Sequence, residues 1–168
     1  MGKKSVSLRG ARRATKQSRS EIASVSRQGG IPRNDKPLRL IDVNFNRAKE
    51  GLRVCEDILR FLYDDKMLTS AFKRLRHDCS GVLLEFPVSY RRLVEARNSA
   101  DDVGKKSVIL EKKKPYWNDL LVSNIKRAEE SLRVLEEASK VIAPTKSRRF
   151  QFLRFKLYEL EKRALKKF

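Results

Sequence analysis

An internal repeat constrains the fold of this chain more than any other feature. Thirteen residues beginning at Asn44 align with thirteen beginning at Asn124, and eight of the thirteen positions are identical at a constant offset of 80. The offset continues more weakly downstream, where Phe72 and Arg74 recur 80 positions later. A duplicated helical hairpin explains both matches. Two such hairpins bury their apolar stripes best against each other, which predicts a four-helix bundle with approximate two-fold symmetry.

The hydrophobic periodicity agrees with that architecture. Apolar residues at helical spacing predict helices over about Leu38–Tyr63, Lys66–Glu85, Val88–Ala96, Pro115–Ile142 and Ser147–Lys166. Asp42 is placed to cap or charge the start of the first helix. The long connection Asn98–Lys114 holds one expected extended piece, at Ser107–Leu110. We therefore expect an all-α domain, a duplicated helical hairpin with a short extra helix and a long connection in the middle.

The charge distribution divides the chain in two. Residues 1–36 hold ten Lys or Arg and two acids, with few large apolar residues, so we expect a basic flexible tail there. Residues 37–168 hold thirty bases and nineteen acids and nearly all of the periodic hydrophobicity. The total of 168 residues suits one folded domain of that size.

Several classes of protein are excluded by composition. The longest uncharged runs span six residues, far short of the roughly 20 apolar residues of a membrane span. Cys55, Cys79 and the single His77 are too few for a four-ligand zinc site, so we expect the cysteines to be structural free thiols. No secretory signal follows the basic start. We expect a cytoplasmic protein, with import into an organelle through the basic tail left open.

Two polar residues interrupt the apolar face that the repeat defines. Asn44 and Asn124 lie on this face, where an amide without partners costs about 1–3 kcal/mol. Arg47 and Arg127 flank the same face, and small neighbours such as Gly51 and Ser131 could leave room between the helices for a ligand. The pattern is also typical of a structural polar seam, in which the asparagines fix helix register. On the pattern alone both interpretations remain open.

The net charge of +19 supports a different function. A basic tail on a basic helical domain could neutralise phosphates and bind nucleic acid without catalysis. No helix-turn-helix or RNA-recognition motif accompanies the charge, and basic faces also keep proteins soluble. Nucleic-acid binding is therefore the alternative hypothesis.

The segment Ile41–Asp57, IDVNFNRAKEGLRVCED, resembles the small monofunctional hydroxymethylpyrimidine-phosphate kinase family. This family is the all-helical domain often fused N-terminally to thiamine-phosphate synthase in bacteria. The resemblance covers about residues 39–165. Its further landmarks follow in order: Leu75–Asp78, Ala96–Ser99, Asp102–Gly104, the second repeat, and Leu153–Glu161.

The resemblance implies an enzyme of thiamine biosynthesis. Such a phosphotransferase uses ATP, with Mg²⁺, to convert hydroxymethylpyrimidine phosphate to its diphosphate. It implies that residues 37–168 form a helical kinase-like domain of the stand-alone kind, because the chain stops at Phe168 without room for a synthase barrel. The implied partners are the pyrimidine phosphate, ATP and thiamine-phosphate synthase, with no membrane involved.

The resemblance also suggests roles for individual residues. Phosphoryl transfer depends on positioning and charge stabilisation, which arginines, magnesium and a carboxylate supply. Asp102 and Arg97 are the candidate catalytic residues. Candidates for binding substrate or phosphate are Asn44, Arg47, Asn124, Arg127 and Arg76. Candidate magnesium ligands or proton acceptors are Asp102, Glu50 and Glu130, and supporting roles in the site fall to Glu50, Glu130, Arg53 and Arg133.

Overall fold

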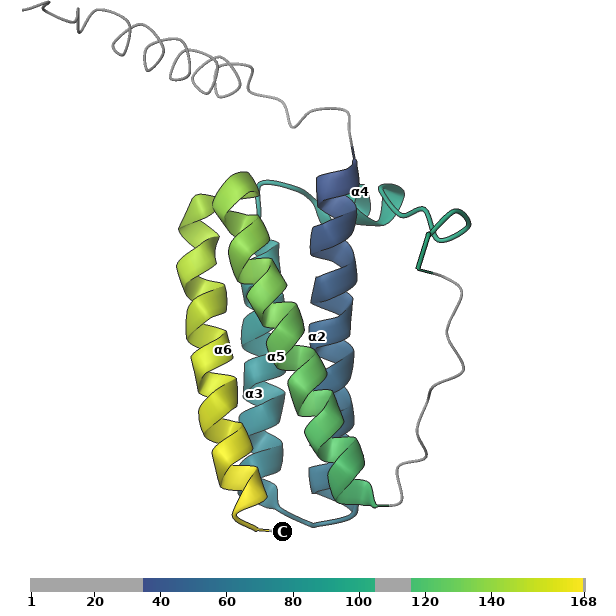
Figure 1. Cartoon of the computed structure of the whole chain (residues 1–168). Helices are drawn as coiled ribbons and strands as arrows, with labels where there is room; N and C mark the ends of the chain where they lie inside the picture. Colours follow the sequence, from purple (N-terminus) through teal and green to yellow (C-terminus); the bar gives the residue numbers. More distant parts are fainter. Residues whose placement is uncertain (1–34, 105–115, 168) are drawn as a thin grey trace, which may run out of the picture. The chain divides into compact units, whose positions relative to one another are not determined.

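The computed structural model describes residues 35–104 and 116–167, and they belong to one compact unit that begins at Asp35. Within these residues the regular structure is helical and no strand occurs: α2 (Lys36–Phe61), α3 (Lys66–Leu84), α4 (Tyr90–Glu95), α5 (Trp117–Ile142) and α6 (Pro144–Leu165) (Figure 1). The predicted all-α class is confirmed. None of the described helices is long and apolar enough to cross a membrane. The extended piece expected at 107–110 and most of the predicted tail fall outside the described residues.

The helix ends follow from local residue chemistry. Pro37 and Pro144 lie in the first turns of α2 and α6, where the missing N–H costs nothing. Pro144 therefore starts the last helix, three residues earlier than the sequence pattern suggested. Asp65 caps α3 by accepting the N–H of Leu68 at 2.9 Å. Ser89 caps α4 in the same way.

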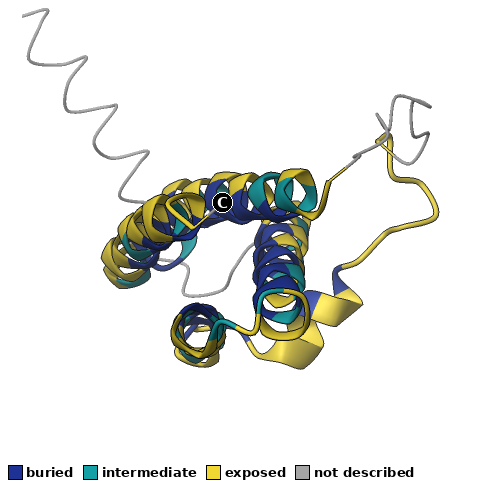
Figure 2. Cartoon of the chain, turned by 90° about the horizontal axis from the view of Figure 1, so that it is seen from below, coloured by how far each residue is buried: buried dark blue, intermediate teal, exposed yellow. Residues whose placement is uncertain are grey.

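The four long helices form the predicted bundle. α2 packs against α3 and α5, α6 packs against the same two helices, and the short α4 lies against α2. Neighbouring long helices run antiparallel (Figure 1). Their buried faces turn toward one another, as the view along the bundle shows (Figure 2). The largest fully buried side chains come from both repeats: Phe72, Phe150, Leu38, Ile41, Leu52, Leu59, Leu68, Leu75, Leu93, Leu121, Ile125 and Leu132.

The two cysteines belong to this core. Cys55 and Cys79 are buried free thiols, as expected from their number. Burial raises the pKa of each thiol to about 12, which makes the thiolate a negligible species near neutral pH. Both therefore act as small apolar residues.

The helices that carry the repeat, α2 and α5, approach each other closely at Gly51. A Cβ at this position would lie 2.7 Å from the backbone oxygen of Asn124 and 3.5 Å from the Cβ of Ala128. The repeat counterpart Ser131 is also buried, and its hydroxyl donates to the carbonyl of Arg127 at 2.8 Å. The expectation that Gly51 leaves space for a ligand is wrong, because the backbone of α5 fills that space.

The second half of the repeat has a different offset from the first. Phe72 is fully buried, as is Phe150, whereas Phe152 is 60% exposed. Arg76 and Arg154 likewise occupy equivalent places, so α3 and α6 correspond at an offset of 78 and not 80. α3 begins ten residues after Glu56, but α6 begins eight residues after the equivalent glutamate. The pairing expected from an uninterrupted offset is wrong by this two-residue deletion.

Candidate functional site

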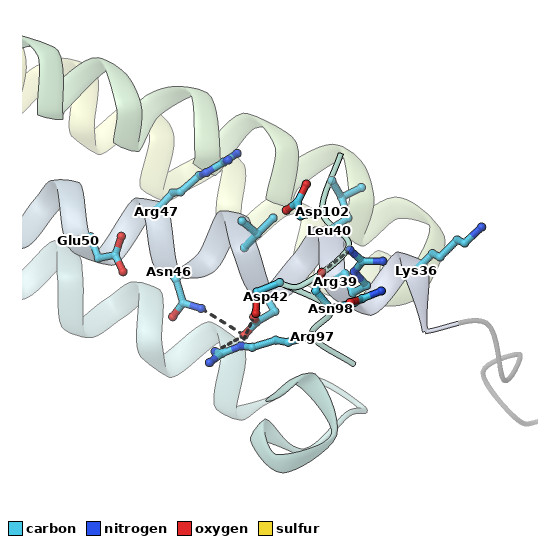
Figure 3. A pocket seen from close by; sticks show the side chains of 12 residues that line it. Lys36, Arg39, Leu40, Asp42, Asn46, Arg47, Glu50, Arg97, Asn98 and Asp102 are labelled. Carbon is cyan, nitrogen blue, oxygen red and sulfur yellow. Dashed lines mark hydrogen bonds and ion pairs between the residues drawn. The ribbon is translucent and has the colours of Figure 1, made fainter. Parts of the chain in front are cut away.

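Two cavities border α2 and have Arg47 and Glu50 in common. The seam cavity, of about 540 Å³, lies between α2 and α5 and is lined by Asn44, Arg47, Glu50, Arg127, Glu130, Ser131 and Val134. The loop cavity, of about 630 Å³, lies between α2 and the segment after α4 (Figure 3). Its lining residues are Lys36, Arg39, Leu40, Asp42, Val43, Asn46, Arg47, Glu50, Arg97, Asn98, Ser99 and Asp102. Most of the residues predicted for a site thus meet in two adjoining cavities.

The seam cavity brings together four charged side chains related by the repeat. Arg47 and Arg127 occupy equivalent positions, as do Glu50 and Glu130, and all four are exposed. None of the four side chains makes a hydrogen bond or ion pair with another residue in the described part of the chain. By contrast, most other charged residues of the repeat, such as Arg53, have ionic partners. The four side chains are therefore available to a ligand, and arginine suits a phosphate or a carboxylate.

The two asparagines of the repeat satisfy their own amide groups. Asn44 Nδ2 donates to the carbonyl of Leu40 at 2.9 Å, and Asn124 Nδ2 donates to that of Leu120 at 2.8 Å. Each residue is only 5% exposed, so this bond offsets the cost of burying the amide. Asn44 lines the seam cavity, whereas Asn124 lines neither of the two cavities. The two asparagines therefore have different surroundings: Asn44 lines the seam cavity, whereas the backbone of Asn124 lies against Gly51.

Asp42 holds the arginine that follows α4. Its carboxylate accepts Arg97 Nε at 2.6 Å and Arg97 Nη2 at 2.8 Å, and it also accepts Asn46 Nδ2 at 3.2 Å (Figure 3). The hydrogen bond from Arg97 to Asp42 raises the pKa of the guanidinium. The prediction that Asp42 caps or charges the helix start is wrong, because Asp42 lies six residues inside α2 and is buried. An aspartate on an otherwise apolar helix face was the signal for this role.

Further hydrogen bonds fasten the segment after α4 to the site. Arg39 Nη2 donates to the carbonyl of Asn98 at 3.2 Å, and Asn98 Oδ1 accepts the N–H of Asp101 at 3.3 Å. Asp102 Oδ1 accepts the N–H of Gly104 at 2.8 Å, and its other oxygen accepts no hydrogen bond from a described residue. Arg39 and Asn98 were not among the predicted site residues, since the contact between them joins positions 59 apart in sequence.

Three further predicted site residues lie elsewhere. Arg76 Nε donates to the buried carboxylate of Glu56 at 2.9 Å, and Arg53 lies 3.5 Å from the same group. Arg133 repeats the arrangement with Glu136 at 2.7 Å. Arg76, Arg53 and Arg133 line neither of the two cavities. In this structure they support the bundle by neutralising buried glutamates.

The carboxylates of the site suit a metal ion that arrives with a ligand. No group of three or more His, Cys, Asp or Glu side chains in the described ranges could hold a metal ion. Glu50 and Asp102 both line the loop cavity, and Glu130 lines the seam cavity. Mg²⁺ commonly binds one or two protein carboxylates together with phosphate oxygens and water. A single carboxylate, Glu50 or Asp102, fits that pattern; the two do not form one ligand pair, because Glu50 lies at one end of the loop cavity and Asp102 lies beside Leu40 (Figure 3).

Comparisons with known proteins identify relatives of the helical bundle. The ThiD2 family matches residues 39–163. Two proteins named thiamine-phosphate synthase, from Synechocystis sp. (strain ATCC 27184 / PCC 6803 / Kazusa) and Thermosynechococcus vestitus (strain NIES-2133 / IAM M-273 / BP-1), are each 36% identical over 124 residues. These matches cover 73% of this chain and 34% of each relative, so the chain spans about a third of the length of these curated relatives. No solved structure matches the chain.

Proposed function

The chain belongs to the ThiD2 family, and from this premise we propose that it is a kinase of thiamine biosynthesis. The proposed reaction transfers a phosphoryl group from ATP to hydroxymethylpyrimidine phosphate and gives the diphosphate. The 36% identity to thiamine-phosphate synthases supports the pathway. The observation that best supports kinase activity is the seam cavity, where Arg47 and Arg127 lack ionic partners among the described residues.

The arginines supply the binding of phosphate groups. Arg47 and Arg127 reach one cavity from two antiparallel helices, so they can hold phosphate oxygens from opposite sides. Arg97 adds a third guanidinium, whose direction is fixed by two hydrogen bonds to Asp42. Positioning of this kind accounts for most of the catalysis in phosphoryl transfer, since the protein does little covalent chemistry.

The transfer itself needs no general base on the protein. An oxygen of the pyrimidine's phosphate forms a bond to the γ-phosphorus of ATP, and the bond from that phosphorus to the β,γ-bridging oxygen breaks. The bridging oxygen keeps the electron pair and leaves as part of ADP. The second pKa of a phosphate monoester is near 6, so the attacking group is already largely a dianion at neutral pH. Asp102 and Glu50 are therefore better suited to holding Mg²⁺ than to accepting a proton.

When bound, Mg²⁺ would neutralise charge on the phosphates of ATP. Either Asp102 or Glu50 would hold it with a single carboxylate, because both line the loop cavity, at separate places along it, and neither carboxylate has an ionic partner among the described residues. Glu130 lies in the seam cavity and completes the set of candidate carboxylates.

The product suggests a functional partner. The relatives that contain a segment similar to this chain are named for thiamine-phosphate synthase, and about two thirds of each relative lies outside the match. A synthase would consume the diphosphate that a kinase forms. We include thiamine-phosphate synthase in the proposal as the partner that acts next.

The direct test is the formation of diphosphate by the purified protein. The full chain is incubated with Mg²⁺, ATP and hydroxymethylpyrimidine phosphate, and with unphosphorylated hydroxymethylpyrimidine in parallel. We expect turnover of the phosphate. Absence of turnover in a sample shown to be folded by circular dichroism would contradict the kinase.

A double variant, Arg47→Ala/Arg127→Ala, then tests the site. We expect at least about a hundredfold loss of kcat/KM, since each lost charge-assisted contact removes about 1.5–3 kcal/mol. The control is Arg60→Ala/Arg148→Ala, which removes the same charge from exposed arginines without ion pairs to described residues. Equal activity of the two double variants would remove the seam cavity from the mechanism.

A further inference from the structure

The loop and seam cavities differ in length along α2. The residues of α2 that line the loop cavity extend from Lys36 to Glu50, which is about 21 Å at the helical rise of 1.5 Å per residue. Those that line the seam cavity extend only from Asn44 to Glu50, about 9 Å. Figure 3 shows Arg47 and Glu50 at one end of the loop cavity and Lys36 at the other. An elongated ligand with several phosphates fits the loop cavity better, and a compact ring with one phosphate fits the seam cavity.

The charged groups divide in the same way. In the loop cavity Asp42 orients Arg97, and Arg39 and Arg47 are further donors; the lining also holds the carboxylates Glu50 and Asp102. Arg39 uses one N–H for the carbonyl of Asn98 and retains others, because a guanidinium has five. Arginines in a cavity that also holds a carboxylate can bind a polyphosphate together with its divalent cation.

The seam cavity instead offers balanced charge and an amide. It holds Arg47 and Arg127 with Glu50 and Glu130, so its lining is neutral overall. Asn44 commits its nitrogen to the carbonyl of Leu40, and its Oδ1 accepts no hydrogen bond from any residue within the described ranges. Carboxylate and amide oxygens accept hydrogen bonds from an amino group on a ring, and the arginines bind a single phosphate.

Several residues that line the loop cavity along α2 are not repeated in α5. Val122 and Lys126 of α5 occupy the positions equivalent to Asp42 and Asn46. Lys126 forms an ion pair with Glu161 of α6 at 2.7 Å, so α6 closes the equivalent face. The two-fold symmetry is therefore broken next to the seam cavity, so the seam cavity and the loop cavity together form an asymmetric site.

On the basis of the proposed function, we infer that the two cavities bind the two substrates separately. The loop cavity binds the nucleoside triphosphate with its divalent cation, and the seam cavity binds the aminopyrimidine phosphate. Arg47 lines both cavities and meets the phosphoryl group as it passes between them. Arg127, its counterpart in the repeat, contacts only the pyrimidine ligand.

The repeat provides matched variants for the test. Dissociation constants are measured by calorimetry on the full chain, separately for hydroxymethylpyrimidine phosphate and for a non-hydrolysable ATP analogue with Mg²⁺. Arg39→Ala should raise the dissociation constant of the nucleotide analogue about tenfold and leave that of the pyrimidine phosphate within about twofold. Arg127→Ala should do the reverse, and Arg47→Ala should raise the dissociation constants of both ligands.

Arg148→Ala is the control, because Arg148 is exposed on α6 and lines neither cavity. The substituted side chains are on the surface, and thermal unfolding confirms that each variant is folded. Weaker binding of the nucleotide analogue by Arg127→Ala, or weaker binding of the pyrimidine phosphate by Arg39→Ala, would overturn the assignment of one substrate to each cavity. Equal weakening of both ligands by all three variants would also overturn it. If the unmodified protein bound neither ligand, the proposed kinase itself would fail.

Discussion

Among single residues, Asp42 has the most specific effect on the site. It is buried, and it fixes Arg97 by two hydrogen bonds across 55 positions of sequence. We predict that Asp42→Asn and Arg97→Ala each raise the KM for ATP about tenfold, because the first frees the guanidinium from its fixed position and the second removes it. The double variant should be no worse than the poorer single variant, since the two residues act as a unit. Steady-state kinetics of the three variants measures this coupling.

Independent effects would contradict this prediction. If the increase in KM of the double variant equalled the product of the two single increases, Asp42 and Arg97 would act on the substrate independently. The free energy of unfolding should also be measured, because an aspartate at 4% exposure that loses its partner destabilises the fold. A KM effect that persists well below the unfolding transition separates binding from stability.

The residues of the site differ in how far the sequence could predict them. The placement of Arg47 and Arg127 beside one cavity was predictable, because the repeat singles out both at equivalent positions on a shared face. Asp42, Arg39 and Asn98 act through contacts with residues more than fifty positions away, which periodicity cannot show. Their roles depend on the path of the chain after α4 and become visible only in three dimensions.

At the scale of elements, the approach of α2 to α5 depends on Gly51. We predict that Gly51→Ala destabilises the protein by about 1–3 kcal/mol, because its Cβ would meet the backbone oxygen of Asn124. This cost exceeds the roughly 1 kcal/mol that alanine gains in helix propensity. Urea denaturation gives the change. The matched control is Ser131→Ala at the equivalent position, which should cost less than about 1.5 kcal/mol for one lost hydrogen bond. A stabilised Gly51→Ala variant would show that the helices can separate.

A second prediction concerns the contact between the end of α3 and the start of α6. Hydrogen bonds from Arg149 and Lys146 lower the pKa of Glu85 to about 2. Because the pKa in the folded state lies below the unfolded value, this pair stabilises the fold above about pH 4.5 and the contribution is lost as the pH falls toward 2. In Glu85→Gln the decline in the free energy of unfolding over this range should be shallower. Unfolding by urea at several pH values, at low salt, measures the difference, and identical slopes would contradict the assignment.

The elements also show where sequence reasoning about the repeat stops. The first helices of the two repeats share eight identical residues in thirteen, so their alignment and their helical state were predictable. The second helices share little identity, and a deletion of two residues in the connection shifted the true pairing to Phe72 with Phe150. Burial reveals such a shift because a core position must be filled by an apolar side chain whatever the alignment.

For the whole molecule, duplication explains the framework and divergence explains the site. Both halves keep a buried glutamate held by arginines, Glu56 with Arg76 and Glu136 with Arg154. Removing one partner of such a pair is costly, which favours its retention in each copy. The face next to Asp42 differs between the halves because the second copy has Val122 there. A symmetric bundle thus carries one asymmetric site.

The last prediction distinguishes the kinase from nucleic-acid binding. Residues 1–34 hold nine Lys or Arg and one Glu, a large part of the net charge of +19. A deletion that ends at residue 34 keeps Asp35, which precedes α2 and accepts a hydrogen bond from Arg92 at 2.8 Å. We expect the shortened protein to form diphosphate within about twofold of the full chain, because the arginines of both cavities lie beyond residue 35. Binding to a DNA duplex is measured over a range of salt concentrations. In the deletion the binding should be weaker, and its dependence on salt concentration should be less steep, as expected for a nonspecific contact with phosphates. If turnover were absent from both proteins while the full chain bound DNA tightly, the basic charge would define the function and the two cavities would have structural roles only.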